Sequence, residues 1–298
     1  MFGLMVTSLE QGLVFGIMAL GVYITFKVLD FPDLTVDGSF PLGAAVASII
    51  IFNNGNPLLA LFFATVAGIT AGCITGLLNT RAKITGLLSS ILTMTALYSI
   101  NLRIMGRANV TLLNSRTIFT YLEEWGVPHS WVFLALFTIA AFLIKSLLDC
   151  FLKTQIGFAL RATGDNPEMA RANGINTDTM KILGLSLSNG LVALSGALVA
   201  QYQGFADIGM GIGTIVAGLA SVIIGEMMLG ERSIGVATFA SLMGSFIYRL
   251  SIGIALRLGF AATDLKLLTT ILVIIALSTP KIRNLLRSTT SSAVSNGN

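Results

Sequence analysis

Long apolar stretches recur along this chain, and they constrain its fold more than any other feature. A helix crosses a bilayer core about 30 Å thick with about 20 apolar residues. With 54% hydrophobic and only 11% charged residues, the composition is far from that of a soluble domain. The sequence predicts an all-α polytopic membrane protein with about nine transmembrane segments (8–10), short broken or half helices included, at residues 8–26, 36–52, 58–78, 87–105, 132–148, 180–201, 211–229, 234–248 and 265–278.

The interval between the first two segments carries an unusual density of acidic residues and proline. Lys27–Pro41 holds Asp30, Asp33, Asp37 and two prolines between apolar runs. A short helix interrupted in this way is typical of backbone that is broken inside a transporter and faces a cavity. A simple cytoplasmic loop explains the same residues, so both interpretations stay open.

Glycine rows predict close helix packing. Gly68, Gly72 and Gly76 lie on one face of the third segment, and Gly12 and Gly16 lie in the first. Small residues at this spacing let helix backbones approach closely in membrane proteins. Such rows indicate packing and not a ligand site.

The longest polar interval that reads as a helical element is Gly157–Thr177. Its charges recur at three- and four-residue spacing, so in a helix they would lie near one another and alternate in sign. Asn166 suits the N-cap of a short helix with Pro167 at its first position, and Gly174 is placed to end it. An ordinary solvated loop is the alternative. The four charges are Arg161, Asp165, Glu168 and Arg171.

The basic residues indicate an orientation, because cytoplasmic loops carry an excess of Lys and Arg. With Gly157–Thr177 in the cytoplasm, the N-terminus is expected outside and the C-terminus inside. The assignment places successive loops on alternate sides of the membrane, so it fails if Lys27–Pro41 is re-entrant and does not join two crossings. Twelve of the 18 basic residues then lie in the cytoplasm: Lys27, Arg81, Lys83, Lys145, Lys153, Arg161, Arg171, Lys181, Arg232, Lys281, Arg283 and Arg287.

Motifs for catalysis or nucleotide binding are absent from the sequence. It has no G-x-x-x-x-G-K-[ST], H-E-x-x-H, C-x-x-C or G-x-S-x-G. His129 stands without metal-ligand neighbours, and Cys73 and Cys150 lie in apolar surroundings. The basic residues are divided among short loops, which argues against nucleic acid as a partner. We therefore expect no catalytic residue, no metal site and no cofactor bound by this chain.

A transport role remains, in more than one form. Glu226 and Asp207 are the best candidates for an ion relay, yet both fit interfacial positions. An ion-coupled secondary transporter or a channel is therefore an alternative to a permease driven by a separate ATPase. A purely structural scaffold is disfavoured, because broken helices cost stability.

The run GFALRATGDNPEMARANGINTDTMKILGLSLSNGLVALSGALVA resembles the cytoplasmic loop and following span of permease subunits of bacterial ABC importers. The family is that of the branched-chain amino acid and ribose permeases. DLTVDGSFPLG at 33–43 and IIGEMMLGERSIG at 223–235 look like its two broken-helix turns. The second departs from the family in carrying Glu226 and Glu231 where Gly or neutral residues are usual, which leaves the solute open. The loop pattern is matched by Gly157, Arg161, Ala162, Asp165, Asn166, Ala170, Gly174, Ile175 and Asn176.

The resemblance covers about residues 8–285 and implies a multi-subunit machine in the bacterial plasma (inner) membrane. A second permease subunit, as a homodimer or a related chain, would enclose the path. Two ATP-binding subunits would use ATP and Mg²⁺, and a substrate-binding protein would dock outside. The permease domain would occupy 1–287, with a cytoplasmic coupling loop at about 153–179 and a disordered polar tail at 288–298. The likeness is closest to amino-acid uptake permeases, with aromatic amino acids among the expected solutes.

Two sets of site residues follow from the resemblance. A helix over Asn166–Asn173 would be the coupling helix lodged in a groove of an ATPase subunit. The broken segments would line the solute path or its gate, although packing and capping also explain their polar residues. The coupling set is Gly157, Arg161, Ala162, Asp165, Asn166, Glu168, Ala170, Arg171 and Gly174; the path set is Asp33, Thr35, Asp37, Ser39, Glu226 and Glu231.

Overall fold

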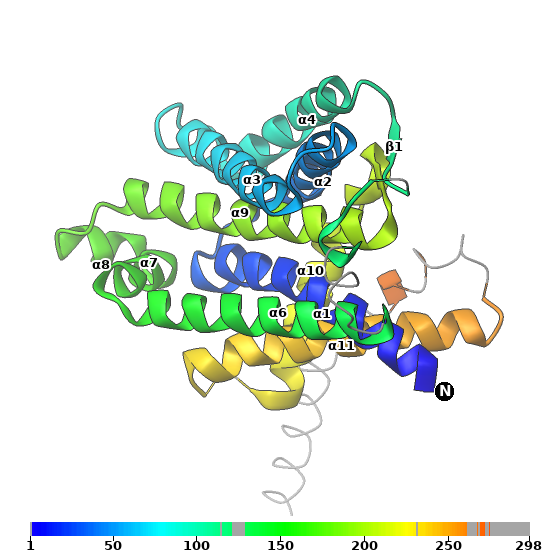
Figure 1. The fold of residues 1–298 in the computed structure, drawn as a ribbon. Helices are drawn as coiled ribbons and strands as arrows, with labels where there is room; N and C mark the ends of the chain where they lie inside the picture. Colours follow the sequence, from blue (N-terminus) through cyan, green and yellow to red (C-terminus); the bar gives the residue numbers. More distant parts are fainter. Residues whose placement is uncertain are drawn as a thin grey trace, which may run out of the picture.

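The computed structural model describes residues 2–113, 115–120, 129–230, 232–260, 267, 269–271 and 274. Over this part the chain is almost entirely helical, as the sequence predicts (Figure 1). The elements in order are α1 (Phe2–Tyr23), η1 (Ile24–Val28), α2 (Val36–Phe52), α3 (Pro57–Thr80), α4 (Gly86–Met105), β1 (Asn109–Thr111), α6 (His129–Lys153), α7 (Gln155–Asp165), α8 (Pro167–Ala172), α9 (Thr177–Gln203), β2 (Phe205–Asp207), η2 (Ile208–Gly211), α10 (Thr214–Leu229) and α11 (Ile234–Arg257).

Seven segments of the described chain are long and apolar enough to cross a membrane. The eighth apolar helix, α2, has 17 residues and starts at Val36. This segment is also predicted from the sequence to begin at residue 36. The expected segment 265–278 falls mostly outside the described residues, as does the tail 288–298, so the total is compatible with about nine. The spans are Met5–Val28, Pro57–Thr80, Gly86–Met105, Phe133–Lys153, Thr177–Gln203, Ile208–Leu229 and Ile234–Arg257.

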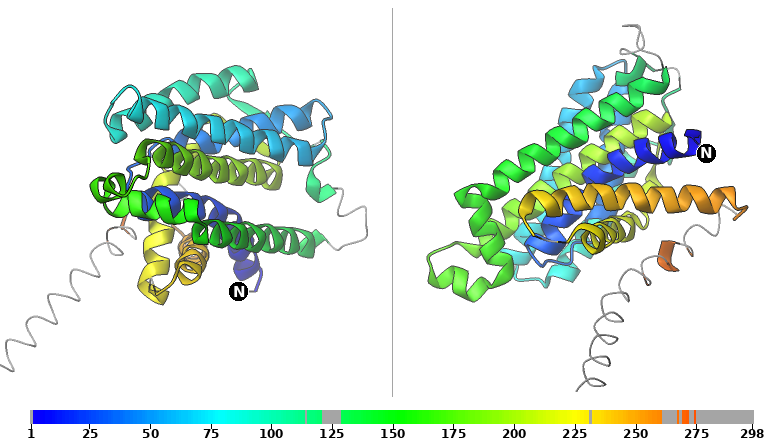
Figure 2. Two further views of the ribbon diagram at one scale, coloured as in Figure 1. Left: turned by 90° about the vertical axis from the view of Figure 1, so that its left-hand side faces the viewer. Right: turned by 90° about the horizontal axis from the view of Figure 1, so that it is seen from below.

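Helix α9 lies at the centre of the bundle. In Figure 1, α2, α3 and α4 group on one side of α9, while α1, α6, α10 and α11 lie on the other, and Figure 2 shows the same grouping from two further sides. The glycine row of α3 faces α9 as predicted: side chains at Gly68 and Gly72 would overlap the carbonyl oxygens of Asn189 and Leu185. Backbone contact along α3 therefore replaces side-chain packing.

The end of α1 is not regular. The helix continues through a single π-helical turn, η1, and the chain then reverses direction into α2. Asp30 and Pro32 are exposed, whereas Asp33 is 2% exposed and Thr35 is fully buried, so the connection starts at the surface and enters the protein at Asp33. The segment thus has a solvated turn at its start and buried backbone from Asp33 onward, so each interpretation of Lys27–Pro41 describes part of it.

A short β-ribbon joins two regions that the sequence treats as loops. β1 pairs antiparallel with β2, with Val110 opposite Ala206. The N–H of Leu112 also donates to the carbonyl oxygen of Gly204, at 2.7 Å. The polar interval 106–130 thus begins with a strand tied to the end of α9, and this pairing was not expected.

Candidate functional site

The polar interval 157–177 forms two helices joined at Asn166, not one. Helix α7 ends at Asp165 because Asn166 is extended (φ −150°, ψ 97°), the conformation favoured before proline. The Asn166 side chain accepts from the N–H of Met169 at 3.0 Å, and Pro167 takes the first position of α8. Gly174 follows with φ +82°, which ends the turn. The predicted cap, first residue and stop are confirmed, and α8 spans Pro167–Ala172.

The four charges do not share one helix face, which corrects the expectation drawn from their spacing. The break at Asn166 leaves Arg161 and Asp165 on α7, whereas Glu168 and Arg171 are on α8. Arg171 contacts the start of α9: its Nε donates to Thr177 Oγ1 at 2.7 Å, and Nη2 lies 3.8 Å from Asp178 Oδ1. Arg171 therefore ties α8 to the start of α9.

An open groove of about 720 Å³ lies between α7 and α8. Its rim is apolar, because Phe158 and Met169 are 63% and 66% exposed. The guanidinium of Arg161 lies 5.7 Å from the centroid of the Phe158 ring. The groove brings together five members of the predicted coupling set; Gly157, Glu168, Arg171 and Gly174 are not among its lining. The lining residues are Phe158, Arg161, Ala162, Asp165, Asn166, Met169, Ala170, Asn173 and Ile175.

Helix α7 packs directly on the π-helical turn at the end of α1. A side chain at Gly164 would overlap the carbonyl oxygen of Val28, so α7 and η1 approach backbone to backbone. The same turn carries Lys27, whose Nζ lies 2.7 Å from Glu226 Oε2 on α10. The turn η1 thus contacts both α7 and α10, and it links the α7–α8 unit to α10.

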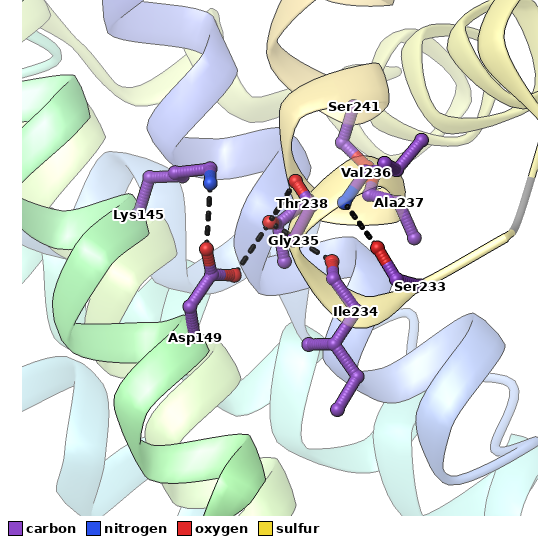
Figure 3. Close-up of polar contacts among 9 residues, drawn as sticks. All are labelled: Lys145, Asp149, Ser233, Ile234, Gly235, Val236, Ala237, Thr238 and Ser241. Carbon is purple, nitrogen blue, oxygen red and sulfur yellow. Dashed lines mark hydrogen bonds and ion pairs between the residues drawn. The ribbon is translucent and has the colours of Figure 1, made fainter.

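A second connection links α6, which leads into α7, with the start of α11 (Figure 3). Lys145 Nζ lies 2.6 Å from Asp149 Oδ2, and Thr238 Oγ1 donates to Asp149 Oδ1, also at 2.6 Å. Ser233 caps α11 by accepting from the N–H of Val236 at 3.4 Å. Sequence reasoning missed Asp149 and Thr238, since a Lys and an Asp at i, i+4 in an apolar helix give no sign of a third partner on another helix.

Two of the predicted path residues, Asp33 and Ser39, meet at Asn189 of α9, and a third, Thr35, contacts α3. Asn189 Nδ2 donates to Asp33 Oδ2 at 2.8 Å, and Ser39 Oγ donates to Asn189 Oδ1 at 2.7 Å. The hydroxyl oxygens of Thr35 and Thr75 lie 2.9 Å apart. All of these side chains are buried. The structure therefore gives Asp33, Thr35 and Ser39 partners within the fold, and their role in the path stays a prediction.

Asp37 caps α10 from the first turn of α2. One carboxylate oxygen accepts from the N–H of Ile215 at 2.8 Å and from Thr214 Oγ1 at 2.9 Å; the other accepts from the N–H of Gly213 at 3.0 Å. A carboxylate is well suited to the positive end of a helix dipole. Glu226 lies at the other end of α10, in the ion pair with Lys27, and Glu231 falls outside the described residues.

A bundle of apolar helices, most of them long enough to cross a bilayer, with a short capped helix pair beside the spans, is the architecture of a multi-pass membrane protein. A family model described as the permease component of the branched-chain amino acid transport system matches residues 4–278, and the chain belongs to that family.

Two curated relatives match most of the chain. It is 45% identical over 289 residues to a tyrosine transport system permease protein of Clostridioides difficile (strain R20291), covering 97% of this chain and 95% of the relative. It is 24% identical over 245 residues to the ribose import permease protein RbsC of Escherichia coli K12, covering 79% and 74%. The chain is therefore the membrane-spanning permease subunit of an ABC importer, a transport subunit.

Solved structures share the fold at low sequence identity. PsaBC from Streptococcus pneumoniae in complex with Fab matches with a TM-score of 0.54 and 15% identity, over 90% of this chain and 89% of that one. An ABC transporter solved in an inward-facing conformation matches with the same TM-score and 16% identity, over 93% and 84%. At this level of identity the likeness is one of fold alone.

Proposed function

We propose that this permease carries an amino acid with an aromatic side chain, and that tyrosine is a solute to test first. The observation that supports the solute is the 45% identity, from end to end, with a permease named for tyrosine transport. Ribose permeases in the same family are much less similar, which argues for an amino acid over a sugar.

We further propose that α8 is the coupling helix and that the groove between α7 and α8 meets the ATPase subunit. The support is geometric. Asn166 and Gly174 fix both ends of α8, and the apolar rim at Phe158 and Met169 is exposed as a contact surface would be. Arg161 and Asp165 at the same rim would fix the register of that contact.

The assembly that this role requires contains two copies of the permease, two ATP-binding subunits and a substrate-binding protein outside. The chain itself has no nucleotide-binding motif, so ATP and Mg²⁺ act in the partner subunits. With α7 and α8 in the cytoplasm of a bacterial cell, the N-terminus lies outside and the C-terminus inside the plasma membrane.

ATP-dependent uptake tests the solute and the energy source together. The complete importer, with its ATPase subunits and binding protein, is reconstituted in vesicles and supplied with radiolabelled L-tyrosine or D-ribose. We expect uptake of tyrosine and not of ribose, and we expect it to need ATP. Ribose uptake would contradict the proposed solute. Tyrosine uptake that survives ATP depletion but collapses with an ion gradient would contradict ATP coupling.

A further inference from the structure

Arg249 is a cation inside an apolar helix whose charge the described fold does not neutralise. It lies on α11, eight residues before the helix ends at Arg257. Its Nε is buried and has no hydrogen-bond partner among the described residues. Its side chain as a whole is only partly exposed. The Nε–H is therefore removed from water without receiving an acceptor from the part of the chain that the structure describes.

Two lysines of the bundle are paired with carboxylates. Lys145 lies 2.6 Å from Asp149, and Lys27 lies 2.7 Å from Glu226. A charged side chain within a membrane span is costly, and such residues are retained mainly where they pair with one another or serve a transport path. Arg249 has no such anion among the described residues, and a role in the transport path is compatible with this.

The surroundings of Arg249 are aromatic. Its Cζ lies 3.3 Å from the centroid of the Phe15 ring on α1. Phe15 in turn stacks on Phe40 of α2, with centroids 5.6 Å apart and planes at 28°. A cation over a ring face gains electrostatic attraction but leaves the N–H groups in the guanidinium plane free. Phe40 directly follows Ser39 and lies three residues after Asp37, so the predicted path residues of α2 are its near neighbours in sequence.

We propose that Arg249 binds the carboxylate of the transported solute as it passes through the permease. The planar fork of a guanidinium matches a carboxylate with two parallel N–H···O bonds. The ring of Phe15, which is partly exposed and is backed by the buried ring of Phe40, offers an apolar surface for a solute side chain beside that carboxylate. This inference rests on the proposed function and names the chemical group that the permease itself recognises.

Direct binding to the permease tests the proposal without the selectivity of the binding protein. The complex of this permease with its ATPase subunits is purified without the binding protein, and binding of radiolabelled L-tyrosine is measured. Competitors are 3-(4-hydroxyphenyl)propionate, which keeps the carboxylate and lacks the amine, and tyramine, which keeps the amine and lacks the carboxylate. We expect the propionate to compete and tyramine to fail. This comparison needs no variant, so it holds even if substitutions at Arg249 prevent folding.

Variants then test whether tyrosine binding depends on the Arg249 side chain. Arg249→Gln should weaken tyrosine binding by about tenfold or more, as expected on removal of a desolvated charge partner. Arg249→Lys, which keeps the charge without the fork, should lie between Arg249→Gln and the wild type. The matched control is Arg257→Gln, an exposed arginine on the same helix, which should bind as the wild type does.

Several results would overturn the carboxylate site. They are wild-type affinity in Arg249→Gln, competition by tyramine equal to that by the propionate, and no tyrosine binding by a complex that still transports tyrosine in vesicles. The last result leaves the proposed function standing. If the vesicles take up no tyrosine at all, the proposed solute is wrong, and the carboxylate site is withdrawn with it.

Discussion

At the scale of single residues, Asn189 connects α9 to α2 and to the buried turn that precedes α2. Its amide donates to Asp33 and to the carbonyl oxygen of Leu185, and its carbonyl accepts from Ser39. All three polar side chains are buried. An asparagine in an apolar span is visible in the sequence, but its partners lie about 150 positions away, so no local pattern could identify them. Asp33 and Ser39 could be selected from sequence as candidates, but not as partners of Asn189.

Replacing Asn189 should therefore cost more than one hydrogen bond. In Asn189→Leu, the buried carboxylate of Asp33 and the hydroxyl of Ser39 each lose a partner. Leaving buried polar groups unsatisfied is expensive, so we expect the free energy of unfolding to fall by about 3 kcal/mol. Ser39→Ala removes a single bond and should cost about 1 kcal/mol. Thermal unfolding of the purified permease in detergent measures both, and equal midpoints for the two variants would contradict this account.

At the scale of elements, the sequence predicts what depends on short-range chemistry. The apolar runs locate the long helices, and the Asn166–Pro167 pair with Gly174 locates α8. The same local signals fail where structure depends on distant partners. β1 pairs with a strand that lies after α9, and Arg171 bonds beyond its own helix, to Thr177. The spacing of the four charges was misleading because the proline that starts α8 also ends α7.

The coupling role of α8 can be tested on its exposed side chain. Ala170→Trp is a poor probe, because Ala170 is 3% exposed and a larger side chain would disturb the fold. Met169→Glu instead places a charge on the apolar rim, and Arg161→Glu reverses the charge beside it. We expect both variants to reach the membrane at wild-type levels and to lose most ATP-dependent uptake. Copurification of the ATPase subunits with the tagged permease should fall in parallel.

A matched control separates the rim from the rest of the segment. Asn173→Ala lies in the same groove but removes only an amide that bonds the carbonyl oxygen of Met169. It should retain the ATPase subunits and most uptake. Undiminished uptake by Met169→Glu and Arg161→Glu would show that the groove between α7 and α8 is not the contact with the ATPase.

At the scale of the whole molecule, the α7–α8 unit is joined to the α10–α11 hairpin along two routes. One route runs from Gly164 through Val28 and the adjacent Lys27 to Glu226 on α10. The other runs from α6 through Asp149 to Thr238 on α11 (Figure 3). A displacement of α7 and α8 would therefore reach both helices of the hairpin. The second route is the better one to test, since its ion pair is the less exposed of the two, with side chains 17% and 14% exposed against 28% and 32%.

We expect the contacts of Asp149 to stabilise the fold and also to transmit a displacement of α6 to α11. Two variants distinguish these roles. Asp149→Ala leaves Lys145 without its anion in a mostly buried position, so we expect a loss of about 3 kcal/mol of unfolding free energy. The double variant Lys145→Met/Asp149→Leu removes both charges, and apolar replacement of a buried pair is often close to neutral. Thr238 keeps a bond to the carbonyl oxygen of Ile234 at 3.1 Å in either case. We expect the double variant to unfold near the wild-type temperature and still to transport more slowly per ATP hydrolysed. If its uptake recovers together with its stability, the ion pair holds α6 against α11 but transmits nothing to the hairpin.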